Sequence, residues 1–365
     1  MNLIVLDKNF DIVGPVSSFT SLLWTRRYYE PGAFELYCLP EYFSVLDAGE
    51  YLYRSDRSEL GVISSVIYEV KTDGTRLSCC KGLFAESLLD RRVIELPFNK
   101  YAAPEVISRE LVRLYAIEPS DSARAMPHIV LGELKELGSK VQKQITGDRL
   151  GSACFDIEKT QELSHRLRYD HLANNLIFEV YQGLDRRQSQ DKNTWAVFSS
   201  SFCNVKTARY ERNSADWANV AYVAGEDSGS DRKVVEVDIS KEGDQRREIY
   251  VDARDLQSAD DAGNTLYTED EYRSLLYQRG LEKLSEHELI ESVDSEIDPY
   301  ANLVYLKDFD LGDLVTFRHP EFGIEVDKRI TEVREVLEGA AMQLDITFGQ
   351  DGINSLKKLI KQEVG

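Results

Sequence analysis

Two segments that lie far apart in this chain share one residue pattern, and a repeat of this kind restricts the fold more than any other feature. The pattern residues are Gly49, Glu50, Leu52, Arg54, Gly61, Ile63, Val66, Leu77 and Gly82 in the first segment, and Gly312, Asp313, Val315, Arg318, Ile330, Val333, Leu344 and Gly349 in the second. The part that begins at each isoleucine aligns without a gap, because Ile63 and Gly82 are 19 residues apart, as are Ile330 and Gly349. The pattern predicts one small β unit used twice, with chance recurrence of a short apolar pattern as the alternative.

The length and composition indicate an ordinary soluble protein of several domains. The chain has 365 residues, 42% of them hydrophobic and 30% charged, and a chain of this length usually divides into two to four domains. No apolar run approaches the roughly 18 residues of a membrane span. The first seven residues also lack the basic start and the long apolar run of a signal peptide. We therefore expect a protein that stays where it is made unless a larger particle carries it out.

Charge and cysteine content narrow the possible partners. The net charge is −20, which argues against an electrostatic grip on nucleic acid, because that grip needs Lys and Arg to replace counterions. An acidic surface does suit DNA that slides past without binding. The five cysteines cannot all pair within the chain, and their spacing fits no zinc pattern. We expect reduced, buried thiols.

The first 97 residues are predicted to be almost entirely β. The apolar and aromatic runs are short and separated by turn signals such as Glu30-Pro31-Gly32 and Thr72-Asp73-Gly74-Thr75. The abundance of aromatic residues, 19 Tyr and 14 Phe, also suits sheets. The first segment therefore indicates a small β-barrel or sheet.

The rest of the chain mixes helices and strands. Helices are predicted at 104–116, 156–167 and 268–290, the last opened by a capping box that begins at Thr268. A strand is predicted at 174–182, further strands lie between 196 and 251, and a linker follows at 257–265. Strands return from 291 to 348, and a short amphipathic helix is predicted at 354–363. The expected domains are a first β-barrel (1–97), a mixed α/β domain (98–190), a β-rich segment of the second barrel or its neighbour (191–267), a helix and second β-barrel (268–350) and a C-terminal helix (351–365).

Catalytic patterns are lacking. The five histidines lie apart in the sequence, and there is no phosphate loop, no nucleophile elbow and no dinucleotide-binding glycine pattern. Asp255, Asp260 and Asp261 miss the spacing of a calcium loop. We expect no catalytic residue, no cofactor and no metal. A glycosidase pair among the many carboxylates stays open as an alternative.

Several stretches together resemble a known family. They are 24–36, 89–92, 178–186, 219–226, 247–254, 308–315 and 329–333, with the sequences WTRRYYEPGAFEL, LDRR, FEVYQGLDR, NVAYVAGE, REIYVDAR, DFDLGDLV and RITEV. The first resembles the N-terminal signature of long-tailed phage and prophage tail proteins that act as baseplate or tail-tip hubs. Ala33 departs from the pattern, where an acidic residue is expected. The signature residues are Gly32, Phe34, Glu35, Arg91, Arg92, Gly183, Asp185, Arg186, Gly225, Leu311, Gly312, Asp313, Arg329, Ile330, Glu332 and Gly349.

The resemblance implies a mainly β fold with α+β insertions, in which two related tube-like β-barrels are joined by smaller mixed domains. It also implies a homotrimer, in which three chains with two similar units each present six units to a sixfold tail tube. The implied partners are the tail tube or distal tail protein and a tip or fibre protein. The resemblance further implies that DNA passes through the lumen without specific binding. The implied location is the virion tail, after synthesis in the bacterial host cytoplasm.

The predicted function is therefore a non-enzymatic, structural tail-tip hub. Two alternatives remain, the hub of a contractile injection device or tailocin, and a tail-associated cell-wall hydrolase. A third alternative, a receptor-binding adhesin, is less well supported, because receptor-binding proteins usually lie at the far end of a fibre. Since the chain ends after the predicted short helix, we expect any wall-degrading activity to belong to a separate partner.

Overall fold

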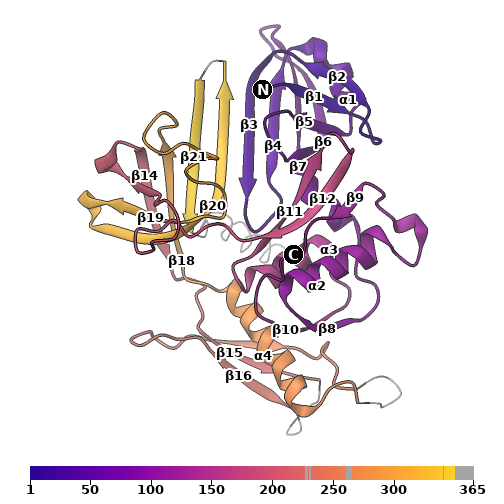
Figure 1. The fold of residues 1–365 in the computed structure, drawn as a ribbon, viewed down its shortest axis with the longest axis vertical. Coiled ribbons are helices and arrows are strands. Elements are labelled where there is room, and N and C mark those ends of the chain that lie inside the picture. Colours follow the sequence, from indigo (N-terminus) through magenta and orange to yellow (C-terminus); the bar gives the residue numbers. More distant parts are fainter. Residues whose placement is uncertain (227–228, 230–231, 260–264, 340, 350–365) are drawn as a thin grey trace.

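The computed structural model describes residues 1–226, 229, 232–259, 265–339 and 341–349, and the fold is mainly β with α+β insertions (Figure 1). This confirms the predicted fold class at that level. The predicted helix at 354–363 lies outside the described residues.

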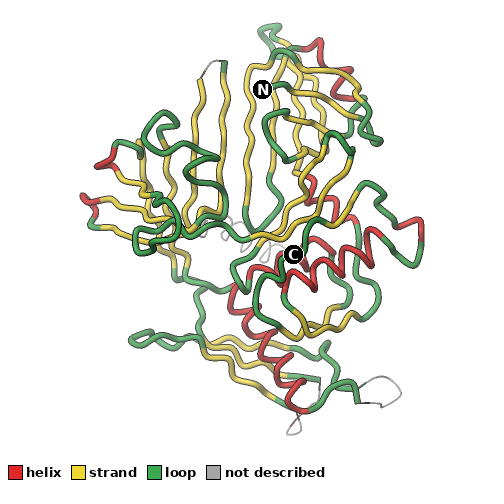
Figure 2. The backbone as a smooth tube through the Cα atoms, viewed as in Figure 1, coloured by secondary structure: helices red, strands yellow, loops and turns green. Residues whose placement is uncertain are grey.

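The largest sheet runs through both ends of the chain, with β20 beside β3 (Figures 1 and 2). Its main path has the order β14-β18-β21-β20-β3-β4-β7-β6-β5-β1-β2, and β19 pairs with both β20 and β13. Its strands are β1 (Leu3–Leu6), β2 (Ile12–Val16), β3 (Phe19–Arg27), β4 (Ala33–Cys38), β5 (Tyr51–Arg54), β6 (Leu60–Val70), β7 (Arg76–Phe84), β13 (Val197–Ser199), β14 (Val205–Asn213), β18 (Ile290–Ile297), β19 (Leu314–His319), β20 (Ile324–Glu338) and β21 (Ala341–Gly349).

Three small sheets and four α-helices complete the described fold. The small sheets pair β10 with β8, β12 with β11 and β9, and β15 with β16 and β17. Their strands are β8 (Phe98–Ala102), β9 (Ile129–Leu131), β10 (Val141–Ile145), β11 (Ser164–Asp170), β12 (Asn175–Tyr181), β15 (Val220–Ala224), β16 (Val234–Asp238) and β17 (Glu248–Asp252). The helices are α1 (Phe43–Asp47), α2 (Pro104–Val112), α3 (Leu150–Lys159) and α4 (Glu269–Glu286), with short helical turns η1 (Pro40–Tyr42), η2 (Ala85–Arg91), η3 (Arg113–Ile117), η4 (Ser122–Arg124), η5 (Ser200–Phe202) and η7 (Pro320–Phe322).

The middle of the chain packs on the first strands. One apolar core joins Leu6 and Phe10 to residues of α2, α3, β11 and β12. The helix predicted at 156–167 lies earlier in the chain, since α3 spans Leu150–Lys159, and the bounds are wrong because β11 begins at Ser164. The apolar residues of 164–170 serve as the buried side of a hairpin with β12, and that pairing decides the structure.

Helix α4 forms a separate layer with β15, β16 and β17. The predicted capping box is confirmed, since the Thr268 hydroxyl accepts from the Glu271 N–H and the Glu271 carboxylate accepts from the Thr268 N–H. The helix can lie close to the sheet because a side chain on Gly280 would meet Val223 and Val237. Residues 191–267 thus contribute to two regions, because β13 and β14 belong to the large sheet and β15, β16 and β17 form the small sheet that packs on α4.

Cysteine burial follows the prediction at four positions. Cys38, Cys79, Cys80 and Cys154 are buried and unpaired, whereas Cys203 is exposed, so the prediction of a buried thiol is wrong there. Cys203 follows β13 in a left-handed turn that faces solvent. Among the described helices, none is long and apolar enough to cross a membrane.

Candidate assembly interface

The large sheet contains the same arrangement of strands twice. In the first β unit the order is β3-β4-β7-β6-β5, and in the second β unit it is β14-β18-β21-β20-β19. Each unit keeps its long hairpin, β6–β7 or β20–β21, in the middle of this order. The chain therefore carries two β units of one topology, joined side by side.

Both long hairpins bulge at the aligned isoleucine. The register shifts after Ile63 in the first unit and after Ile330 in the second. The extra residue carries a hydroxyl in both cases, and Ser64 and Thr331 each donate to a backbone carbonyl of the opposite strand. Each isoleucine N–H also donates to the acidic residue of the Gly-acid pair, Glu50 O at 2.9 Å and Asp313 O at 2.8 Å.

The alignment shifts by one residue beyond the hairpin turn. Val66 faces Cys80, and a strictly ungapped repeat would place Thr347 opposite Val333, but Ile346 lies there. The ungapped spacing is therefore wrong for the last strand of each unit. The first hairpin closes through residues 71–75, and a shorter turn in the second removes one residue from the register.

The outer strands of the two units also correspond. The pairing of β3 with β4 shifts between Phe19 and Ser21, and the pairing of β14 with β18 shifts between Val205 and Thr207. Counting from these bulges, Trp24 in β3 corresponds to Tyr210 in β14. The correspondence therefore extends across all four long strands of each unit.

The two units meet where β20 pairs antiparallel with β3, from Glu332 opposite Arg27 to Glu338 opposite Ser21. Arg27 Nε donates to Glu332 Oε2 at 2.8 Å, on the face away from the core. We call this pairing the internal junction. It continues one sheet from the second unit into the first, as Figure 1 shows.

A fully buried carboxylate reinforces the internal junction. Glu335 of β20 accepts from Arg54 Nη2 at 2.7 Å and from Arg57 Nη2 at 2.6 Å and Nε at 2.9 Å. The Arg54 guanidinium also lies over the Trp24 ring, 5.6 Å from its centre. Burial alone would lower the pKa of Arg57, but Glu335 outweighs it and the pKa is raised. Because a buried charge without its partner is costly, this group fixes how the two units lie together.

A second buried cluster lies beside it. Arg26 Nε donates to Glu59 at 2.6 Å, and Arg26 Nη1 donates to Asp310 at 2.6 Å and to the Tyr305 hydroxyl at 2.8 Å. Burial opposes the charge of Arg26, yet Glu59, Tyr305 and Asp310 hold its pKa well above the ordinary value. Sequence reasoning missed both clusters, because an isolated Glu or Arg in a strand looks like surface charge.

Half of the signature residues come together beneath the second unit. Gly183 and Gly312 are in backbone contact, where a side chain on Gly183 would lie 1.9 Å from Gly312 O, and Gly312 has φ +88°. Asp313 accepts from the Leu184 N–H at 2.7 Å and from Arg186 Nε at 2.8 Å. Burial raises the pKa of Asp313 despite these donors. The other members, which adjoin this group, are Asp185, Leu311, Arg329 and Ile330.

The remaining signature residues are dispersed. Phe34 fills the core of the first unit, Gly32 precedes β4 and Glu35 lies on that strand's outer face. Gly225 adjoins Tyr272 of α4. The positions of the others are the end of η2 for Arg91 and Arg92, the internal junction for Glu332 and the end of β21 for Gly349. The signature therefore marks several structural contacts and no single site.

One face of the large sheet is open and acidic. On the four long strands of each unit, one set of alternating side chains enters the cores and the other set is mostly exposed or half-buried. On this open face carboxylates outnumber cations. They are Glu35, Glu69, Glu211, Asp294, Glu296, Glu332, Glu338 and Asp345, against Arg27, Lys81, Lys206, Arg209 and Arg334.

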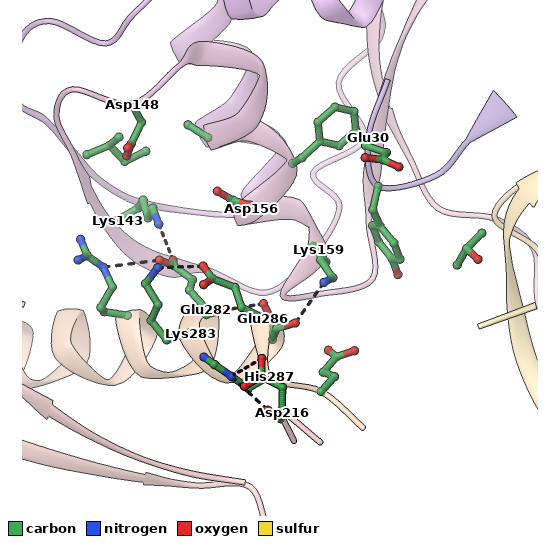
Figure 3. Close-up of a pocket in the computed structure, with 18 of the residues that line it drawn as sticks. Glu30, Lys143, Asp148, Asp156, Lys159, Asp216, Glu282, Lys283, Glu286 and His287 are labelled. Atoms are coloured by element: carbon green, nitrogen blue, oxygen red, sulfur yellow. Dashed lines mark hydrogen bonds and ion pairs between the residues drawn. The ribbon is translucent and has the colours of Figure 1, made fainter. Parts of the chain in front are cut away.

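A groove of about 590 Å³ separates α3 from α4 (Figure 3). Lys143 and Glu282 form an ion pair across it at 2.5 Å, and Lys159 donates to the Ser285 carbonyl at 3.1 Å. The groove therefore lies between two layers of the fold that an ion pair and a hydrogen bond connect.

The described histidines do not converge. His165 is buried and bonds Glu158 at 2.8 Å, and His287 lies 3.1 Å from Asp216 in another layer. In the part of the chain that the structure describes, no group of three His, Cys, Asp or Glu residues is placed to hold a metal ion.

Three solved structures share this fold across nearly the whole chain. The 43 kDa tail protein of prophage MuSo2 from Shewanella oneidensis has 12% sequence identity and a TM-score of 0.60, covering 96% of this chain and 98% of that one. The prophage tail protein gp18 from Listeria monocytogenes EGD-e has 14% identity and a TM-score of 0.58 over 100% of both chains. The tail protein from Neisseria meningitidis MC58 has 13% identity and a TM-score of 0.54 over 96% of each.

A protein-family model described as Siphovirus ReqiPepy6 Gp37-like protein matches residues 2–350. The chain therefore belongs to this siphovirus tail protein family, and the resemblance to phage and prophage tail proteins is confirmed. No curated protein matches the chain.

Proposed function

We propose that this tail protein is the hub of the tail tip, a non-enzymatic adaptor between a sixfold tail tube and threefold tip or fibre proteins. The observation that carries the proposal is the duplicated β unit, with its matching strand order and bulges. Three chains supply six such units, which is the number that a sixfold ring requires.

The open acidic face supports the placement of this ring around the DNA exit channel. If the open face of each sheet lines the lumen, its excess of carboxylates repels the phosphates of passing DNA. DNA then moves through without specific binding. The same face is unsuited to binding DNA, because a DNA-binding surface needs cationic side chains that contact the phosphates.

The hub of a contractile injection device has the same geometric requirement and is the second candidate. Six similar units would again match a sixfold tube, so only the neighbours differ. Genes for a sheath next to the gene for this chain would favour that candidate.

The decisive experiment is a cryo-electron microscopy map of an intact tail tip. We expect three copies of the chain, arranged as six β units directly below the tube with the open faces inward. A single copy, a position along a fibre, or a ring whose lumen is lined by the opposite face would overturn the proposal. Release of muropeptides from cell walls by the purified chain would contradict its non-enzymatic part.

A further inference from the structure

Among the edges of the large sheet that the described chain leaves without a partner, two belong to long strands, β6 and β14. In β6, β5 covers only Leu60 to Val62, so the outer side of residues 65–70 pairs with no described strand. Strand β14 pairs with β18 alone. Unpaired edges of this length invite pairing with another strand.

These two edges are the counterparts of the strands that meet at the internal junction. Strand β6 occupies in the first unit the position that β20 has in the second, and β14 corresponds to β3. The internal junction joins β20 to β3. The same contact between a β6 and a β14 requires a second copy of the chain, because six strands of the sheet path separate β14 from β6 within one chain.

The bulges fix the register of that contact. Counted from them, Tyr68 corresponds to Glu335 and Tyr210 corresponds to Trp24, and Glu335 faces Trp24 in the internal junction. Resting on the proposed function, we propose that β6 of one copy pairs antiparallel with β14 of a second copy so that Tyr68 lies opposite Tyr210.

The chemistry of the two edges agrees with this register. The next pairs along the strands place Glu69 opposite Arg209 and Val70 opposite Ala208. Glu69 and Arg209 are both exposed in the isolated chain and carry opposite charges on the open face. On the core face, Tyr68 is 42% exposed, Val70 57% and Tyr210 36%, so the pairing covers apolar groups that face water in one chain alone.

The test is disulfide cross-linking between two single-cysteine variants. Both carry Cys203→Ser, which removes the exposed native thiol while the other four cysteines are buried. An equimolar mixture of Glu69→Cys and Arg209→Cys chains is oxidised, and covalent dimers are measured on a non-reducing gel. The matched control mixes Glu69→Cys with Tyr210→Cys, because residues 209 and 210 point to opposite faces.

We expect the first mixture to form about tenfold more covalent dimer than the control mixture, since only facing side chains on one side of a sheet meet. Each variant alone is expected to give the background. Equal or greater cross-linking in the control mixture overturns the register.

A second measurement separates this inference from the proposed function. Multi-angle light scattering of the wild-type chain at the same concentration reports the oligomer. A trimer in which neither mixture cross-links overturns the β6–β14 contact and leaves the hub function standing. A tail-tip map without a six-unit ring overturns both the contact and the hub function. A loss of the oligomer in Glu69→Arg that is restored by adding Arg209→Glu supports the contact without any cysteine.

Discussion

The two β units have the same strand order, and they differ in what covers their outer strand. In the first unit β20 covers β3, and Trp24 of β3 is fully buried against Phe34 and Phe84. In the second unit β14 is open, and Tyr210 is 36% exposed and donates to Glu291. A junction inside one chain can bury a charged group, because the oppositely charged partner belongs to the same chain and is always present. An edge strand that pairs only when chains assemble is exposed to water before assembly, so its side chains must also be stable in water.

The largest expected effect breaks the internal junction. Glu335→Ala should lower the free energy of unfolding by about 4 kcal/mol, because Arg54 and Arg57 lose their buried carboxylate. The counterpart variant, Tyr68→Ala, should change the stability of the isolated chain by less than about 1 kcal/mol. Urea denaturation of both variants measures the difference. Equal losses in the free energy of unfolding would contradict the expectation that only the Glu335 position is buried in the isolated chain.

The next effect compares the two aromatic counterparts. Trp24→Ala should cost about 3 kcal/mol, because its side chain is wholly buried. Tyr210→Ala should cost less than about 1 kcal/mol in the isolated chain but should reduce the trimer fraction in light scattering. A large loss of monomer stability in Tyr210→Ala would show that β14 is already covered.

A smaller effect concerns the loop that leads into the second unit. Gly312→Ala should cost about 2 kcal/mol, because a left-handed conformation and a contact with the Tyr28 ring both oppose a side chain there. Gly74→Ala in the first unit's hairpin is the matched control. Its φ is +82° with open space around it, so it should cost only about 1 kcal/mol for the backbone strain. Thermal denaturation of both variants separates strain from contact.

The smallest effect is a pH dependence beside the first unit, where Glu86 contacts the mixed domain. Burial raises the pKa of Glu86, whose carboxylate accepts from the Leu167 N–H. The folded state therefore holds the proton more tightly, and the stability that this adds is lost as the pH rises through the raised pKa. Relative to the wild type, Glu86→Gln should become more stable as the pH rises from 4 to 8. Parallel melting curves that keep a constant difference would contradict this.

The sequence predicted the local features of the fold well. The hairpin turn at Gly74, the capping box at Thr268 and the equivalence of Ile63 with Ile330 each depend on a few neighbouring residues. The register of β7 and β21 was missed by one residue, because the two hairpins close through turns of different length. Turn length is where homologous hairpins differ most.

The internal junction was harder to predict from the sequence. Glu335 lies in a strand in which Glu332 and Glu338 face outward, and the residue type alone does not distinguish the buried glutamate from these two. Its partners are far away in the chain, with Arg54 at the end of β5 and Arg57 in the loop that follows. Pairing across such a distance is decided by tertiary packing, so propensity and periodicity do not report it. A carboxylate on the core side of an alternating strand was the one available signal.

The fixed internal junction also restricts the ways in which a ring of these units can close. Each chain adds two units at once, so rings of five or seven units cannot form, and the nearest wrong assemblies have four or eight. A change of two units alters the diameter of the bore more than a change of one unit would. Under the proposed function, the covalent linkage of the two units therefore allows only even numbers of units in the ring, and this restricts the diameter of the channel.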